Sequence, residues 1–199
     1  MVRKGELTRE RIVKKAAPVF NKFGYAGTSM SDIMRETGLE KGGIYNHFST
    51  KDELAFAALE YSTSVMTERL REIFAQNPNA IARILACAQM YYELARDELL
   101  IGGCPLLNTA IEADDAHPAL KARAREAMNQ LVDTIRRVLE KGIARGEVRA
   151  DADSARAALT LVTLMEGALM MTKLVENESP LDAAMVTLNQ FIDANLRPV

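Results

Sequence analysis

The chain has 199 residues, 48% of them hydrophobic and 26% charged, with a formal net charge of −2. Two cysteines are too few for a disulfide framework, and no apolar run approaches the roughly eighteen residues of a transmembrane helix. Since the N-terminus has no signal-peptide pattern either, we expect a cytoplasmic protein with a substantial core and no membrane partner.

Charge is distributed unevenly along the chain. Residues 1–51 carry ten Lys or Arg and five Asp or Glu, a net of +5. Residues 52–199 carry fifteen and twenty-two, a net of −7. A basic N-terminal part on an acidic body favours attraction to phosphate groups at one end only.

The stretch Gly27–Leu54 predicts two short helices around a tight turn. Thr28 or Ser29 is a candidate cap for the first helix, with Asp32 near its positive end. Pro18 in the preceding helix is expected to bend it. Gly38 predicts a left-handed stop between the two short helices. The apolar positions of the first short helix recur at helical spacing and form its inward face: Met30, Ile33 and Met34.

The second short helix is predicted to start at Glu40 or Lys41 and to bury Ile44 and Phe48. Its outer surface then carries Lys41, Gly42, Gly43, Tyr45, Asn46 and His47. Each helical glycine costs about 1 kcal/mol relative to alanine. Close approach to a DNA duplex would explain the two glycines, and a merely solvated surface turn is the alternative.

The remaining chain predicts further helices separated by Pro, Gly and Asn. A Thr50–Glu53 capping box begins a helix to about residue 75. Further helices are expected over about 78–100 and 105–113, from a start within 115–118 to about 146, from a cap at Asp151 or Asp153 to about 175, and over 179–197. The prediction is an all-α protein of about nine helices, with a three-helix head over residues 1–50 and a helical body over 51–199.

From Thr8 to Leu54 the sequence resembles the N-terminal domain of the TetR family of transcriptional regulators. The matching positions are Phe20, Gly24, Tyr25, Gly27, Thr28, Ser29, Gly38, Lys41, Ile44, Tyr45, Phe48, Lys51 and Leu54. The resemblance implies an all-helical homodimer with a small-molecule pocket in its C-terminal domain. Most members are repressors that an effector releases from DNA, so the implied partners are a palindromic double-stranded operator and a small effector.

The resemblance also assigns roles within the head. Lys41, Gly42, Gly43 and Asn46 are predicted to contact base edges or the groove. Thr28, Tyr45, His47 and Lys51 are predicted to contact phosphates. Two departures concern the operator sequence: Glu40 stands where members often have Ser or Thr, and Gly43 where they often have a small hydroxyl residue or Ala.

The last two long helices are expected to form the dimer interface. Residues 157–171 are apolar nearly all round, and the final helix has one apolar stripe. In the family such a pair from each subunit makes a four-helix bundle. The alternative is that both helices complete a monomer core.

Candidate effector contacts lie along the body helices. Methionine-rich surfaces repack around varied apolar ligands, and polar groups in apolar surroundings need a partner that a ligand can supply. The set comprises Met66, Phe74, Met90, Tyr91, Cys104, Leu107, Asn108, Ile111, Met128, Leu131 and Glu166. For Glu166 an intrachain hydrogen bond is an equal alternative, and apolar helical positions are more often plain core.

Cys104 supports a second hypothesis, a thiol-based sensor of oxidants or electrophiles. It stands at the expected start of a helix, before Pro105, where the positive helix end stabilises a thiolate. The glycines before it would leave its sulfur accessible. The simpler interpretation is a small residue closing a tight helix start, while Cys87 belongs to the core.

A remote alternative is a metal-binding helical-bundle enzyme. Its support is Asp114-x-x-His117, an acid three residues before a histidine. The spacing spans an expected helix break, Pro118 follows, and His117 is more simply part of the next helix's cap. We therefore predict no catalytic residue, metal or cofactor.

Overall fold

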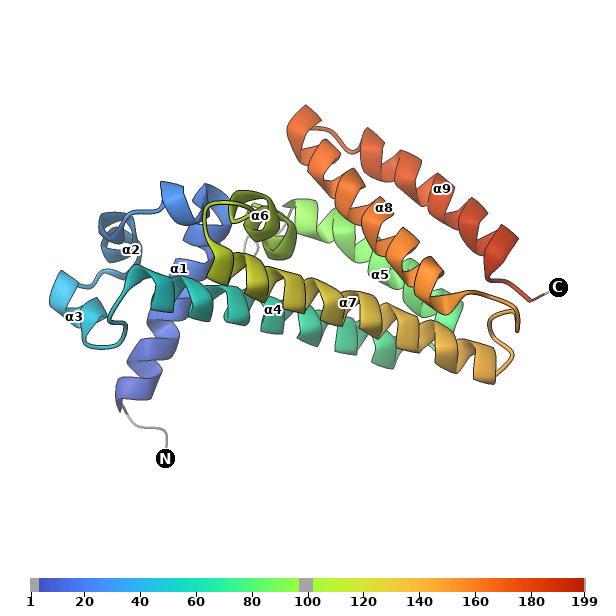
Figure 1. Cartoon of the computed structure of the whole chain (residues 1–199), viewed down its shortest axis with the longest axis horizontal. Coiled ribbons are helices and arrows are strands. Elements are labelled where there is room, and N and C mark those ends of the chain that lie inside the picture. Colours follow the sequence, from blue (N-terminus) through green and yellow to red (C-terminus); the bar gives the residue numbers. More distant parts are fainter. Residues whose placement is uncertain (1–3, 97–101, 199) are drawn as a thin grey trace. The chain divides into compact units, whose positions relative to one another are not determined.

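The computed structural model describes residues 4–96 and 102–198. In these ranges it contains nine α-helices and no strand, which confirms the all-α prediction (Figure 1). The helices are α1 Lys4–Gly27, α2 Met30–Thr37, α3 Lys41–Tyr45, α4 Lys51–Gln76, α5 Ala80–Arg96, α6 Pro105–Glu112, α7 Pro118–Ala144, α8 Ser154–Val175 and α9 Ser179–Asn195. The helix expected over 78–100 is observed to Arg96, and its predicted end lies outside the described residues.

The chain divides into two compact units. The first unit comprises Met1–Met66 and Glu98–Arg125, and the second comprises Thr67–Asp97 and Glu126–Val199. Helices α4 and α7 each contribute residues to both. The functional boundary expected near residue 50 therefore falls inside the first unit and stays a prediction.

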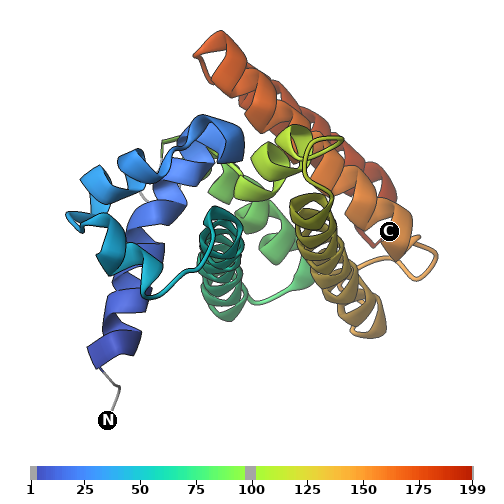
Figure 2. The ribbon, with the colours of Figure 1, turned by 60° about the vertical axis from the view of Figure 1, so that its left-hand side comes forward.

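The core of the first unit joins α1, α2, α3 and the start of α4, which Figure 2 shows gathered around α1. The apolar side chains predicted to face inward on α2 and α3 do so, because helices of eight and five residues are unstable in water unless such side chains are buried. The fully buried set is Ile12, Val13, Ala16, Ile33, Ile44, Phe48 and Leu54.

Local capping fixes where the short helices begin and end. Ser29 caps α2 in a reciprocal box, because its hydroxyl accepts the Asp32 N–H and its own N–H donates to the Asp32 carboxylate. Gly38 ends α2 at φ 70°, as predicted. At α4 the box predicted for Thr50 is only half formed, since the Glu53 carboxylate accepts the Ser49 N–H instead.

The break in α1 falls at Gly24 rather than at Pro18. Gly24 has φ 75° and ψ 172°, a conformation essentially restricted to glycine. A β-carbon there would lie 2.5 Å from a carboxylate oxygen of Glu112 in α6. The backbone turn therefore requires glycine at this position, and a β-carbon would also displace the Glu112 carboxylate from its two backbone hydrogen bonds.

In the second unit α8 packs on α5 and α9, and α8 and α9 run side by side (Figure 1). By length and composition alone α8 would also span a membrane, with 44% of its most apolar window buried. The expectation that no segment is apolar enough to span is thereby corrected, and packing on α5 and α9 accounts for the buried part of that composition. Cys87 of α5 is buried as expected, and burial raises the pKa of its thiol to about 12.

Candidate functional site

The outer surface of α3 carries the side chains predicted to meet DNA. Lys41, Tyr45 and Asn46 are exposed, and His47 is half-buried. The Lys41 ammonium lies 5.6 Å from the centre of the Tyr45 ring. In the described part of the chain the Asn46 side chain makes no hydrogen bond, so its amide remains available to another molecule.

The two glycines of α3 have no internal reason to be glycine. A β-carbon on Gly42 would meet nothing within 4 Å, and one on Gly43 would make only an ordinary 3.5 Å contact with Leu39. Neither has a positive φ. Alanine at either position would therefore fit the fold, and its higher helix propensity would favour the helix.

Thr28 is not on this outer surface. It is only 1% exposed, and its hydroxyl donates to the Gly24 carbonyl at 2.7 Å. The prediction that its side chain meets a phosphate is therefore wrong for the structure described, because the hydroxyl closes the end of α1 instead. Lys51 is half-buried, with its ammonium 4.2 Å from the centre of the Tyr25 ring.

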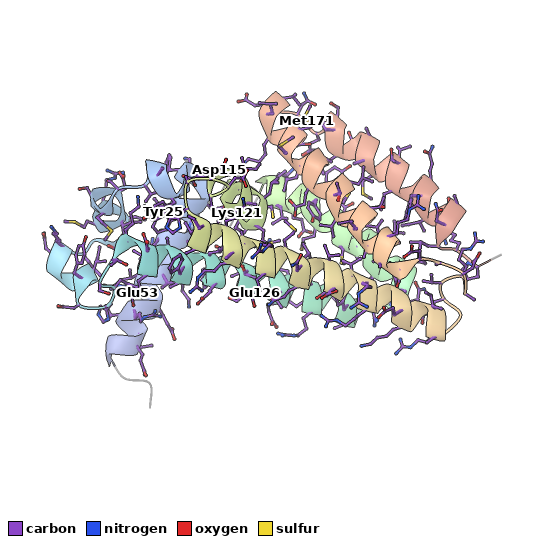
Figure 3. All side chains as sticks on the ribbon, viewed as in Figure 1. Tyr25, Glu53, Asp115, Lys121, Glu126 and Met171 are labelled. Carbon is purple, nitrogen blue, oxygen red and sulfur yellow. The ribbon has the colours of Figure 1, made fainter. Side chains whose placement is uncertain are left out.

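A polar cluster ties the end of α1 to the starts of α4 and α7. The Tyr25 hydroxyl donates a short hydrogen bond to Asp52, which raises the pKa of Tyr25 to about 12 and lowers that of Asp52. His117 Nε2 lies 3.4 Å from Asp52, and its ring meets Tyr25 edge-on at 4.7 Å. Tyr25 is labelled in Figure 3.

A second set of bonds joins α1 to α6. The Glu112 carboxylate accepts the backbone N–H groups of Tyr25 and Ala26, each at 2.7 Å. The Asn108 amide donates to Asn21 Oδ1 at 3.0 Å and to the Gly102 carbonyl at 2.8 Å. The end of α1 is thus fixed by side chains more than eighty residues away in sequence.

These helices enclose a cavity of about 270 Å³, which we call the first-unit cavity. Its walls combine large apolar side chains, alanines and a few polar groups. Residues of α1, α4, α6 and the start of α7 line it, together with the turn between α6 and α7: Ala17, Phe20, Asn21, Tyr25, Ala26, Ala55, Ala58, Leu59, Ser62, Pro105, Asn108, Thr109, Glu112, Ala113, Ala116, His117 and Leu120.

Two family descriptions match most of the chain. "Bacterial regulatory proteins, tetR family" matches residues 12–58, and "Tetracyclin repressor-like, C-terminal domain" matches residues 80–188. The chain belongs to the TetR family. It is accordingly a DNA-binding transcriptional regulator and not an enzyme, and its kinds of partner are operator DNA and a small-molecule ligand.

Solved TetR structures share the whole fold. A TetR transcriptional regulator from Chloroflexus aurantiacus J-10-FL is 44% identical, with a TM-score of 0.92 and 100% of both chains covered. A TetR-family regulator from Cytophaga hutchinsonii is 34% identical, with a TM-score of 0.94 and 100% of both chains covered. The HTH-type transcriptional repressor DhaR of Mycobacterium sp. strain GP1 is 25% identical over 174 residues, 87% of this chain and 86% of DhaR.

The effector contacts expected for a TetR regulator are divided between the two units. Met90, Tyr91 and Leu131 line a cavity in the second unit of only about 30 Å³, room for one or two water molecules. Glu166 is buried in the same unit and accepts the Tyr91 hydroxyl at 3.0 Å, the intrachain alternative. Phe74 and Met128 are half-buried there as well.

The other expected contacts belong to the first unit. Asn108 lines the first-unit cavity, whereas Met66 is buried and Leu107 is half-buried outside its lining. Ile111 is 61% exposed and lies outside that lining too. Sequence reasoning missed Phe20, Ala58, Ser62 and His117 as lining residues, because small and polar side chains on separate helices give no periodic signal.

The first unit corrects the expectation for Cys104 and bears out the one for His117. Cys104 starts α6 before Pro105 as predicted, but it is 1% exposed, so its sulfur is not accessible. The acidic and histidine side chains of the remote metal hypothesis have separate partners: Asp114 pairs with Lys121, and His117 Nδ1 accepts the Leu120 N–H at 3.2 Å. His117 is thus a helix cap, the simpler interpretation.

Proposed function

We propose that the protein is a cytoplasmic, homodimeric repressor that a small effector releases from a palindromic operator. The single observation that carries the proposal is the outer surface of α3, where two helical glycines without a structural role lie beside exposed polar groups. Membership of the TetR family and the repressor activity in the name of DhaR support it.

In this proposal α3 enters the major groove. Lys41 reaches guanine, Asn46 pairs with adenine, and Gly42 and Gly43 let the backbone approach the duplex. Tyr45, His47 and Lys51 contact phosphates, which fix the register without reading sequence. The buried Thr28 hydroxyl has no part in this set, although its capping bond holds the start of α2 in place.

Dimerisation is proposed through α8 and α9. Both helices leave large apolar side chains in water: Leu159, Met170, Met171, Leu174, Val175 and Val186, with Leu174 73% exposed. Met171 is labelled towards the end of α8 (Figure 3). A monomer rarely exposes such a row, and a dimer would place two α3 helices on half-sites roughly 34–36 Å apart.

The proposed DNA contacts are tested by two substitutions. Asn46→Ala should reduce discrimination at particular base pairs by about 1–3 kcal/mol, whereas Lys51→Ala should weaken binding to all sequences and lower the salt slope by about 1. Genomic footprinting of the purified protein identifies the operator, and titrations at several salt concentrations measure both variants. Two variants that bind operator and random DNA like the wild type would contradict the assignment.

The proposed interface is tested by Leu174→Glu. A buried carboxylate at a dimer contact is strongly unfavourable, so the variant should sediment as a folded monomer and bind the full operator poorly. Ile111→Glu, on the exposed surface of α6, is the control and should remain dimeric. A dimeric Leu174→Glu protein would place the interface elsewhere.

A further inference from the structure

We propose that the first-unit cavity binds an uncharged one-ring compound bearing a carbonyl or hydroxyl oxygen, with the Ser62 hydroxyl as its hydrogen-bond partner. This inference rests on the proposed ligand response and names its site and ligand class. The site lies between α1, α4, α6 and the start of α7, and Asn108 is the one residue of the effector set predicted from the sequence that lines it.

Ser62 is the observation that points to a ligand. It is 3% exposed, lines the cavity, and makes no hydrogen bond within residues 4–96 and 102–198. The next two hydroxyl residues of α4 do make hydrogen bonds. Thr63 donates to the Leu59 carbonyl at 2.8 Å, and Ser64 donates to the Tyr61 carbonyl at 2.7 Å. A buried serine that faces a cavity and has no acceptor within the described chain can form its hydrogen bond with a ligand atom in that cavity.

The walls around Ser62 suit a small apolar ring. Phe20, Leu59 and Leu120 supply large apolar surfaces, and alanines such as Ala55 and Ala58 leave the space open. A volume of about 270 Å³ is below the roughly 300–1,000 Å³ of sites for drug-sized ligands. One ring with a short substituent is therefore the appropriate size.

The polar part of the wall disfavours an anion. The Glu112 carboxylate is held at the cavity by the two backbone N–H groups of Tyr25 and Ala26. His117 uses Nδ1 to accept the Leu120 N–H, which leaves its proton on Nε2, toward Asp52. The Asn108 amide is occupied by Asn21 and Gly102. Of the two hydroxyl groups in the lining that make no hydrogen bond in the described residues, Thr109 is half-buried and Ser62 is buried, so Ser62 is the better placed donor for a neutral oxygen.

One residue of the cavity wall also contacts the core of the DNA-binding helices. Phe20 lines the cavity and also packs against the core that holds α2 and α3. A ligand that prefers a wider cavity would displace Phe20 and strain the α1–α6 bonds. Since a ligand shifts a population only by binding one state better, such a ligand should weaken operator binding.

The test uses the full-length protein and three probes: acetophenone, ethylbenzene without the oxygen, and benzoate with a charge. Ligand-observed NMR titrations should rank acetophenone first and benzoate last. Ser62→Ala should weaken acetophenone binding roughly three- to tenfold and leave ethylbenzene binding unchanged. Ser64→Ala, two residues along α4 and exposed, is the matched control and should bind all three probes like the wild type.

A second variant fills the space. Ala58→Leu should abolish binding of both neutral probes while a melting curve and operator titration show the fold intact. Equal acetophenone affinity in Ser62→Ala and Ser64→Ala, undiminished probe binding by folded Ala58→Leu, or no acetophenone binding to the wild type would overturn the inference. If one of these results is obtained while the wild-type protein still binds its operator, only the assignment of the cavity has failed. A wild-type protein without any operator would instead overturn the proposed function, whatever the probes do.

Discussion

Two parts of the first unit use glycine and polar side chains in opposite ways. At the end of α1, Gly24 is required by a positive φ and by the approach of Glu112, and the surrounding N–H and hydroxyl groups have partners within the chain. On α3, Gly42 faces open space, and Asn46 makes no hydrogen bond in the described residues.

The difference separates residues that hold the fold from residues that serve a partner. A glycine demanded by internal contacts is explained by the protein itself. A helical glycine in open space lowers helix stability without an internal gain, so the gain must come from what binds there. Substitutions at the two positions should therefore change stability in opposite directions.

The largest effect is expected for Gly24→Ala. The backbone conformation alone disfavours alanine by about 1–3 kcal/mol, and the new β-carbon would collide with Glu112. We expect a loss of about 3 kcal/mol in the free energy of unfolding, measured by denaturant titration. Gly27→Ala is the control, because its β-carbon would lie 3.9 Å from Phe23, an ordinary contact. Equal stability of the two variants would remove the distinction between internal and external glycines.

Smaller effects, a gain in stability and a loss of operator affinity, are expected for Gly42→Ala. Higher helix propensity should stabilise the protein by about 0.5 kcal/mol, while the added methyl group should weaken operator binding roughly tenfold by obstructing the groove contact. Thermal melts and operator titrations measure the two effects. A misfolded variant cannot become more stable, so the combination is diagnostic, and undiminished operator affinity would indicate that α3 does not approach the duplex closely.

The smallest effect is expected for Tyr25→Phe, which removes the hydrogen bond to Asp52 at the end of α1. The bond is partly exposed, so its loss should cost about 0.5–1 kcal/mol near pH 7. The lowered pKa of Asp52 means that the contribution is present above the ordinary carboxyl pKa of about 4 and is lost as pH falls through the lower, folded value.

The pH dependence of stability in alkaline solution follows from Tyr25, the other partner of this hydrogen bond. With the pKa of Tyr25 raised to about 12, its contribution is complete below the ordinary value of 10.0 and disappears as pH rises through 12. The stability gap between wild type and Tyr25→Phe should thus be constant from about pH 5 to pH 9 and narrow on both sides. A gap that widened in acid would show that Asp52 is not the partner.

Much of the fold was predictable because its signals are local. Ser29 with Asp32, Gly38, Pro105 and Asp153 mark helix ends through bonds or backbone preferences within a few residues. The inward stripe of α2 and the outward surface of α3 followed from helical periodicity in the same way. The outward position of the α3 side chains was therefore predictable before any tertiary contact was known, whereas their contact with DNA stays a prediction.

The remaining features depended on contacts between distant residues. The role of Glu112 at Gly24 and the bond from Asn108 to Asn21 depend on where α6 meets α1. Side chains eighty or more residues apart come together there, and helical periodicity carries no information about such pairs. For the same reason the candidate ligand residues chosen from methionine and aromatic spacing were divided between two units.

By itself the sequence determined the helix count and most helix limits within the described residues, since propensity, capping and amphipathic spacing act over one or two turns. Only the tertiary structure decided which polar groups remain for a partner. Thr28 and Asn108 are satisfied by the chain, whereas Asn46 and Ser62 make no hydrogen bond in the part of the chain that the structure describes. Hydrogen-bond satisfaction is a property of the packed molecule, because a donor is available to a ligand only when no distant acceptor has been folded onto it.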